Sequence, residues 1–250
     1  MPLPLTIGTG RALLAQSGNP ALRYTNKVKA LGPIAYYPQA EPSGTTIVDE
    51  SGNGRNGTYV GVTLGQPGIG DGRTAAGYDG VTSYGNIYSA SLAGAWNGQE
   101  LTISTWVRIP TAGVWTDGIA RRVGRIRGGT DLLDIYKLPS TSSVQIDYLA
   151  GGVARGGPLT IGAITTWFQI AITVSKTADQ LRLYLNGAQV GATQTGLGAW
   201  TGLLSASPTQ NVLGASTTVP NSPWLGIKSH TAIFNRALSA AEIASLAVVP

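Results

Sequence analysis

Hydrophobic and polar positions alternate with a period of two through most of the chain, which is typical of β-strands that bury one face. In LTISTWVRI one face holds Leu101, Ile103, Thr105, Val107 and Ile109, and Trp106 points to the other. The segments WFQIAITVS and QLRLYLN repeat the pattern, with Arg182 and Tyr184 on the outer side and an inner row at Phe168, Ile170, Ile172, Val174, Leu181, Leu183 and Leu185. Residues 227–234 form a further predicted strand, with Ile233 inside.

Turn and cap residues mark where these elements end. Asn186-Gly187 follows one strand directly and predicts a two-residue hairpin turn, because both residues tolerate positive φ. Ser239 and Glu242 have the spacing of a capping box, in which serine caps a helix and glutamate bonds back to it. The sequence therefore predicts a short helix at the C-terminal end, with its apolar side at Ile243 and Leu246.

A second short helix is predicted before the strands. Asn19 is a good N-cap and Pro20 suits the first helical position, while Gly32 and Pro33 end the helix. The spacing of three and four places one apolar stripe at Ala21, Tyr24, Val28 and Leu31. So short a helix needs a surface to pack on, either its own sandwich or a neighbouring subunit.

Strands in series without alternating helices favour a sandwich over a parallel α/β sheet. We predict an all-β fold: a two-sheet antiparallel jelly-roll sandwich with a short N-terminal and a short C-terminal helix. Composition agrees, because 35 of 250 residues are glycine and only 12% are charged. Disorder and coiled coils need more charge, and no apolar run is long enough to span a membrane. Two parts are predicted, an arm with its helix at 1–33 and the jelly roll at 34–250.

The net charge of +5 is concentrated at the N-terminal end. The first 40 residues carry four cations and no acid, so the other 210 sum to only +1. We interpret this arm as an assembly element, which an acidic partner surface would attract. Its candidate contact residues are Arg11, Arg23, Tyr24, Lys27, Val28, Lys29 and Leu31. The first 18 residues make a poor signal peptide, since they lack a basic start and contain Pro and Gly.

A second basic cluster lies between Asp117 and Asp131, at Arg121, Arg122, Arg125 and Arg127. We interpret it as a solvated strand face rather than a nucleic-acid site, which would be wider and interleaved with aromatic residues. Asp131 and Asp134 are three apart, which in a regular strand puts them on opposite faces. Their expected role is to balance the arginine charge.

The chemistry-bearing residues argue against an enzyme and against a cofactor. Cysteine is absent and His230 is the single histidine, which excludes cysteine nucleophiles and His-rich zinc sites. Glycoside hydrolysis needs paired carboxylates, yet no strand shows acids alternating along one face. Ser229 and His230 are adjacent and should face opposite ways in a strand, so they cannot form a dyad.

Three tryptophans fall in turn-rich segments and are the candidate contact residues of the body: Trp115, Trp200 and Trp224. Loop aromatics can stack on sugars or anchor a subunit interface. They can equally plug the open ends of a sandwich from within. The sequence leaves these alternatives open.

An ordered series of motifs carries a family resemblance over residues 34–247. AYYPQAE, DESGNGRNGTYVG and YDGVTSYGNI open the series, LTISTWVRI, TTWFQIAITVS and QLRLYLNGAQVG form its centre, and FNRALSAAEIASLA closes it. The body resembles the LamG-like jelly-roll domains of the concanavalin A-like lectin/glucanase superfamily. With its basic arm, the chain is similar to the members found in bacteriophage virion proteins.

The resemblance implies a calcium site near the closing strand, but Ser229 and His230 stand where the family has acidic residues. That departure argues against an inherited metal. Asp49, Asn53 and Asn56 are the other oxygen donors that could hold a hard cation, unless they make local turns instead.

The resemblance leads to a primary prediction and an alternative. The primary prediction is a non-enzymatic structural protein of a bacteriophage virion, a head decoration protein or a tail or fibre component. Its partners would be other capsid or tail subunits and copies of itself, with a trimer as the expected ring, and neither nucleic acid nor a membrane. The protein would be assembled in the host cytoplasm and reside in the virion. The alternative is a carbohydrate-binding lectin or adhesin that recognises host-cell glycans.

Overall fold

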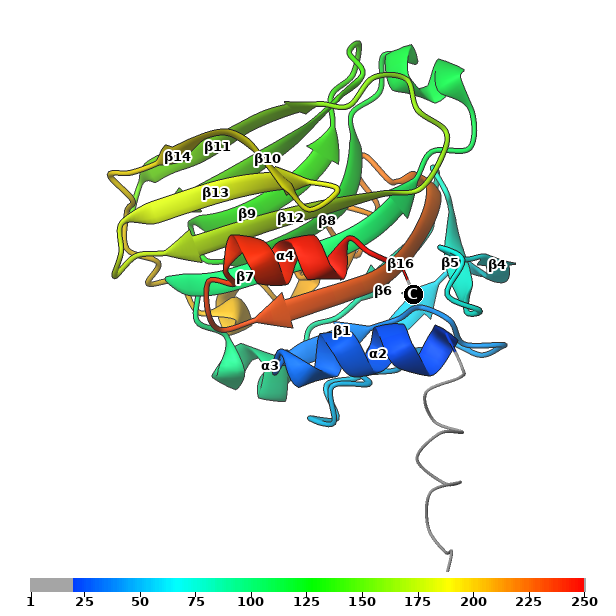
Figure 1. The fold of residues 1–250 in the computed structure, drawn as a ribbon, viewed down its shortest axis with the longest axis horizontal. Helices are drawn as coiled ribbons and strands as arrows, with labels where there is room; N and C mark the ends of the chain where they lie inside the picture. Colours follow the sequence, from blue (N-terminus) through cyan, green and yellow to red (C-terminus); the bar gives the residue numbers. More distant parts are fainter. Residues whose placement is uncertain (1–19, 250) are drawn as a thin grey trace, which may run out of the picture.

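The computed structural model describes residues 20–249, which form two antiparallel sheets packed face to face (Figure 1). Sheet A has the strand order β14-β13-β12-β7-β16-β5-β4, with β1 paired to β16 beside β5. Its strands are β1 (Ala35–Tyr37), β4 (Thr63–Pro67), β5 (Thr74–Asp79), β7 (Glu100–Arg108), β12 (Phe168–Ser175), β13 (Gln180–Leu185), β14 (Ala188–Gln194) and β16 (Leu225–Phe234).

Sheet B has the order β11-β10-β9-β8-β15-β6-β3-β2. Its strands are β2 (Thr46–Ile47), β3 (Gly57–Val60), β6 (Tyr84–Asn86), β8 (Arg121–Gly128), β9 (Asp131–Lys137), β10 (Ser143–Ala150), β11 (Val153–Thr160) and β15 (Val212–Leu213). The helical elements are α2 (Pro20–Ala30), α3 (Ala90–Ala95) and α4 (Ala240–Leu246), with the 3₁₀ turns η1 (Ala112–Thr116), η2 (Leu204–Ala206) and η3 (Pro208–Gln210). The predicted fold class is confirmed.

The main core lies between the two sheets and is built from the inner rows that the alternation predicts. Phe168, Ile170 and Leu181 are 0% exposed, and Leu183 and Ile233 are 5% and 1% exposed. These side chains pack in one cluster with inner residues of sheet B such as Leu133, Val144 and Ile146. The prediction that these positions lie inside is therefore confirmed.

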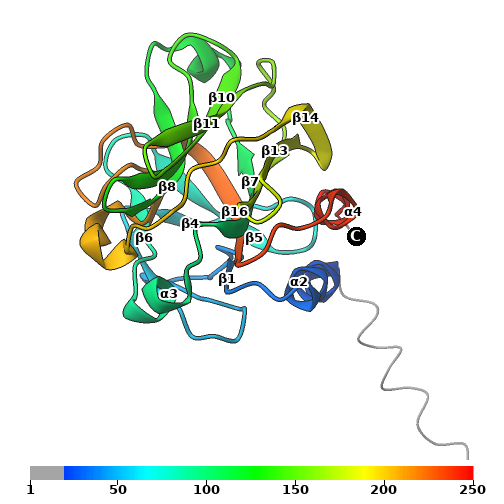
Figure 2. The same ribbon diagram turned by 90° about the vertical axis from the view of Figure 1, so that its left-hand side faces the viewer.

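A second core lies on the outer face of sheet A, beneath α2 and α4. Figure 2 shows both helices on the same side of the sandwich, away from sheet B. Tyr24 and Val28 of α2, Trp106 of β7, and Ile243 and Leu246 of α4 are buried in one cluster. The outer face of sheet A is thus closed by the two ends of the described chain. Within residues 20–249 no helix is long and apolar enough to cross a membrane.

The helix stripe predicted as an assembly surface is occupied by the protein itself. Tyr24 is 1% exposed; its hydroxyl donates to Leu246 O at 2.7 Å and accepts from Trp106 Nε1 at 2.7 Å. Lys27 Nζ donates to the Ser245 and Val248 carbonyls.

Leu31 is partly buried against the same cluster, and its carbonyl accepts from Arg236. The boundary predicted at residue 34 therefore does not separate two packing units, because α2 shares a core with the sandwich. Arg23 and Lys29 remain on the exposed side of the helix, and Arg11 lies outside the described residues.

The predicted hairpin turn and the C-terminal capping box form as expected, whereas the predicted cap Asn19 lies outside the described residues. Asn186 and Gly187 have φ of 49° and 81°, as a two-residue hairpin between β13 and β14 requires. Ser239 accepts from the Glu242 backbone N–H and Glu242 accepts from the Ser239 N–H, which completes the capping box of α4.

Candidate functional site

An irregularity in β8 decides which arginines reach the outer face of sheet B. The register against β9 shifts between Arg122, which pairs with Tyr136, and Gly124, which pairs with Ile135. Burial alternates along β8 and then changes phase at Gly124 and Arg125. Such a bulge adds one residue to one strand and re-aims the side chains that follow.

The bulge places Arg122 and Arg125 on the same face although they are three residues apart. Both guanidiniums bond the same oxygen of Asp134 on β9: Arg122 Nε at 3.0 Å and Arg125 Nη2 at 2.5 Å. The Asp134 side chain is 3% exposed, whereas Arg122 and Arg125 are 18% and 13% exposed. The expected charge balance between Asp134 and the arginine cluster is therefore confirmed.

The neighbouring strand extends this arrangement. Asp147 of β10 stands opposite Asp134, and Gln145 stands opposite Tyr136. Asp147 accepts from the Tyr136 hydroxyl at 3.1 Å and from Gln145 Nε2 at 2.6 Å. We call this surface the polar face; it consists of Arg122, Arg125, Asp134, Tyr136, Gln145 and Asp147.

The polar face combines a planar aromatic ring with charge. The Arg122 guanidinium lies 5.1 Å from the centroid of the Tyr136 ring, within the range of a cation–π interaction. Only Nε of Arg122 and Nη2 of Arg125 bond Asp134, so further guanidinium N–H groups stay available beside the ring. The arrangement can donate several hydrogen bonds next to an aromatic edge.

Hydrogen bonding on the polar face is incomplete within the described residues. Asp134 Oδ1 and Arg125 Nε are buried and have no hydrogen-bond partner there. A buried polar atom without a partner costs about 1–3 kcal/mol. Because both atoms are buried, they are not open to a ligand from solvent.

Asp134 and Asp147 also form a pair of carboxylates that sequence reasoning missed, because they lie on adjacent strands rather than along one. Opposite residues on neighbouring strands have Cβ atoms about 5 Å apart, near the separation used by retaining glycosidases. However, Asp134 is buried and held by two guanidiniums, and Asp147 is bound by Tyr136 and Gln145. The geometry favours a structural role for the pair over attack on a glycosidic bond.

The other charged residues near β8 serve the fold. Arg121 is buried and bonds Asp117, which also pairs with Lys137 Nζ at 2.6 Å. Asp131 accepts backbone N–H groups of Gly151, Thr201 and Gly202, so it fixes loops rather than balancing arginine. The expectation that Asp131 neutralises the cluster is wrong.

The three loop tryptophans are core residues, not surface contacts. Trp115 and Trp224 are 0% exposed and Trp200 is 5% exposed. Their rings pack within the inter-sheet cluster, and Trp115 and Trp200 donate their N–H groups to Ile164 O and Gly202 O. Rings buried in this way cannot stack on a glycan or on another subunit. Of the three interpretations left open, the structure supports the one in which the rings plug the sandwich from within.

In the loop at residues 49–56 the side-chain oxygens of Asp49 and Asn56 accept hydrogen bonds from nearby backbone N–H groups. Asp49 Oδ1 accepts from the N–H groups of Tyr36 and Ser51, and Oδ2 accepts from Arg55 N. Asn56 Oδ1 accepts from Asp49 N, and Asn53 bonds through its amide nitrogen. Among the described residues no cluster of three or more His, Cys, Asp or Glu side chains could hold a metal ion.

We expect thermal unfolding to be the same with and without a chelator such as EDTA. Both carboxylate oxygens of Asp49 already accept backbone N–H groups, so the loop is held together without a cation. Differential scanning calorimetry in calcium and in excess EDTA measures this directly. A melting temperature that falls by several degrees in EDTA would contradict it.

His230 is a buried hydrogen-bonding residue. It has φ of 50° at the register shift in β16, and its Nε2 lies 3.1 Å from Asp71 Oδ2. Nδ1 lies 2.6 Å from the Tyr36 hydroxyl, which donates when the Nε2 nitrogen carries the proton. Burial lowers the pKa of His230, and hydrogen bonding to Asp71 partly offsets this. Ser229 instead bonds Pro38 O, so the two adjacent residues form no dyad.

A surface groove of about 270 Å³ lies along β4, β5 and the start of β16. It is lined by Thr63, Gln66, Asp79, Pro110, Leu225 and Ile227, among others. The Asp79 carboxylate already accepts from the Val81, Thr82 and Ser83 backbone and from two hydroxyls. The groove is large enough for a ligand, but its acidic side chain, Asp79, already accepts hydrogen bonds from its own loop.

Comparison with known proteins places the chain in a family. The sequence profile of the concanavalin A-like lectin/glucanases superfamily (Laminin_G_3) matches residues 79–244. The chain belongs to this family, as the motif series indicates. No curated protein matches the sequence.

Solved structures with this fold include receptor-binding domains of botulinum neurotoxins. The chain is similar to the serotype D binding domain, with a TM-score of 0.64, 13% identity, and coverage of 90% of this chain and 52% of that one. The type G receptor binding domain gives 0.60, 14%, 86% and 51%. The serotype D ligand binding domain in complex with N-acetylneuraminic acid gives 0.62, 14%, 90% and 52%. The chain thus spans about half the length of these structures, and the likeness shows the fold.

Proposed function

We propose that this protein is a non-enzymatic carbohydrate-binding module and that the polar face of sheet B holds the glycan. The observation that carries the proposal is the pair Arg122 and Arg125, brought to one face beside the Tyr136 ring. Guanidinium N–H groups bond sugar hydroxyls and carboxylates, and an aromatic ring packs on the C–H face of a sugar.

The fold supports this class of ligand. The family contains lectins, and one structural neighbour was solved with N-acetylneuraminic acid, an acidic sugar. Fold alone does not assign a function, so the proposal rests on the residues of the polar face. N–H groups of the two guanidiniums can bond a sugar carboxylate or hydroxyl, while Asp134 and Asp147 balance the charge of the polar face.

We expect the protein to retain acidic glycans on a glycan array, and Arg122→Gln to weaken the best of these at least tenfold. A hydrogen bond to a charged group contributes about 1.5–3 kcal/mol, which corresponds to roughly a tenfold to hundredfold change in affinity. Titration calorimetry with the retained glycan measures the change. Asp134 keeps its bond to Arg125 in this variant, so the fold should survive.

Arg182→Gln is the matched control, because Arg182 lies on β13 of the other sheet and also bonds neighbouring side chains. It should leave affinity unchanged. An array without any retained glycan would overturn the proposed function. Binding that Arg122→Gln leaves intact would move the site elsewhere, with the groove at Thr63 and Gln66 as the next candidate. Release of reducing sugar from the bound glycan would contradict the non-enzymatic part.

The virion role inferred from the family resemblance stays a prediction. In that setting the sandwich would display the polar face to host glycans, while exposed charges at Arg23 and Lys29 would contact capsid or tail subunits. Because the apolar stripe of α2 is buried, any such contact would use the outer side of the helix. Subunit contacts of residues 1–33 in an assembled particle, and the oligomeric state by light scattering, test this prediction.

A further inference from the structure

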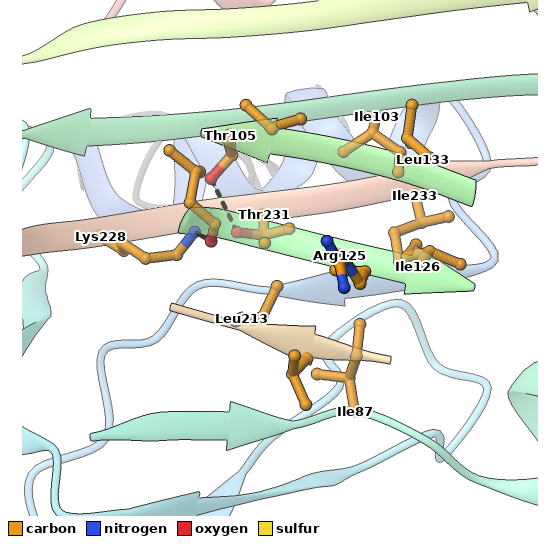
Figure 3. A pocket seen from close by; sticks show the side chains of 14 residues that line it. Ile87, Ile103, Thr105, Arg125, Ile126, Leu133, Leu213, Lys228, Thr231 and Ile233 are labelled. Carbon is orange, nitrogen blue, oxygen red and sulfur yellow. Dashed lines mark hydrogen bonds between the residues drawn. The ribbon is translucent and has the colours of Figure 1, made fainter. Parts of the chain in front are cut away.

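A small cavity lies between the two sheets, directly behind the bulge of β8. It measures about 20 Å³, enough for one water molecule, and its walls are mostly aliphatic side chains such as Ile103, Leu133 and Ile233. Figure 3 shows its polar side, where Lys228 enters from β16 next to Thr105 and Thr231. The two threonine hydroxyls bond each other at 2.8 Å.

Lys228 is an unusual residue for such a place. It is 1% exposed, and no acidic side chain lines the cavity with it. Its Nζ donates to the backbone carbonyl of Val123, 2.5 Å away on β8. The side chain therefore crosses from sheet A to sheet B and bonds the opposite backbone.

Val123 is the residue at which the register of β8 shifts, between Arg122 and Gly124. Its carbonyl accepts from Lys228 and also from the Gly214 N–H at 2.9 Å. The bond from Lys228 is thus made at the position that decides whether Arg122 and Arg125 share a face. Arg125 itself lines the cavity, and its guanidinium bonds Asp134.

We propose that Lys228 is a positioning residue for the polar face: from inside the sandwich it holds the β8 bulge that aims Arg122 and Arg125 at Asp134. The role of Lys228 in glycan binding rests on the proposed function, whereas its effect on the geometry of β8 can be tested without a glycan. The structure explains why a polar amine occupies a site where an aliphatic side chain would pack at lower cost. Function commonly retains such locally unfavourable residues.

The side chains that line the cavity provide no acidic partner for the Lys228 amine. Arg125 is the other charged side chain among the lining residues. Thr231 accepts from Gln39 at 3.0 Å, and Gln39 accepts from the Tyr78 hydroxyl at 2.9 Å, so these hydrogen bonds link the titratable group of Tyr78 to the cavity. Burial lowers the pKa of Lys228 to about 7 and raises the pKa of Tyr78, so only the lysine changes charge near neutral pH.

The test follows the Arg122 Nε–H group by ¹H–¹⁵N NMR in the protein without ligand. Lys228→Met keeps an unbranched side chain as far as Cε and removes the Nζ donor to Val123. We expect hydrogen exchange at Arg122 Nε–H to become at least tenfold faster, while Lys176→Met leaves it unchanged. Lys176 is the matched control, because its Nζ also donates to a backbone carbonyl, that of Leu197, and it is partly buried. Unchanged exchange in Lys228→Met would overturn the proposal.

A second measurement uses the unmodified protein and does not depend on the variant folding. The Arg122 Nε–H shift and the Lys228 Cε shift should follow one common pH midpoint near neutrality, separate from the His230 ring signals. An Arg122 signal that ignores the titration of Lys228 would overturn the proposal. In glycan titrations Lys228→Met should lose threefold to tenfold in affinity. If the unmodified protein binds no glycan, the proposed function fails while the exchange and shift results still decide the role of Lys228.

Discussion

The free energy of unfolding should rise by about 2–3 kcal/mol between pH 7.5 and pH 9.5, and Lys228→Met should remove most of the rise. Burial lowers the pKa of Lys228 to about 7 in the folded state, whereas an unfolded lysine titrates near 10.5. Between these values the unfolded chain binds one more proton than the folded one. Stability therefore increases with pH by about 1.4 kcal/mol per unit, and falls again as pH drops toward 7.

Two other lysines, Lys27 and Lys137, also have pKa values lowered by burial and add to the rise, so the difference between the unmodified protein and Lys228→Met isolates the contribution of Lys228. His230 has a lowered pKa, so its change of charge lies below pH 6.5. Buried tyrosines such as Tyr24 and Tyr36 have raised pKa values, so the unfolded state releases their protons first and stability declines above about pH 10. Urea unfolding at half-unit steps of pH measures the slope, with Lys176→Met as control. Parallel slopes in the unmodified protein and Lys228→Met would contradict the expectation.

The same substitution separates stability from function. Methionine in place of Lys228 removes a buried amine that must lose its proton or stay charged in an apolar cavity. At pH 7.5 the variant should be at least as stable as the unmodified protein, although its polar face is less ordered. A variant that is more stable but binds more weakly is expected where an energetically unfavourable residue is kept for function.

The strands and core were predictable because their signal is local. Alternation along Phe168–Val174 and Leu181–Leu185 marks the inner rows directly, and the turn at Asn186-Gly187 fixes their pairing. Caps such as Ser239 with Glu242 are equally local. These features need only neighbours in sequence, so the two-sheet sandwich followed from the chain alone.

The polar face was not predictable, because it depends on a register shift and on strand neighbours. A spacing of three puts Arg122 and Arg125 on opposite faces of a regular strand, and only the bulge at Val123 reunites them. Asp147 joins Asp134 through pairing of β10 with β9, which no pattern within one strand reveals. The turn-rich surroundings of Trp115 and Trp224 likewise left both exposure and burial open, because only the folded loops show that these rings close an open end of the sandwich.

The N-terminal helix illustrates the limit of a correct element prediction. The sequence predicted the boundaries of the helix and its apolar stripe. An apolar stripe does not show which surface covers it, and the positive charge of the arm favoured a partner subunit. In the structure Tyr24 fills a pocket formed by Trp106 and the last turn of α4, elements more than 80 and 200 residues away. The helix therefore belongs to the energetics of the sandwich.

Tyr24→Ala should destabilise the protein by about 3–5 kcal/mol, the range for removing a large aromatic side chain from a core. Tyr24→Phe should cost about 1–3 kcal/mol, because it leaves Trp106 Nε1 and Leu246 O without their partner. Asn26→Ala, on the exposed side of α2, should stay within about 0.5 kcal/mol. Urea unfolding gives all three values, and deletion of residues 1–33 should destabilise the sandwich by at least as much as Tyr24→Ala. If the truncated chain keeps full stability, α2 is a peripheral arm and the covered face of sheet A needs no helix.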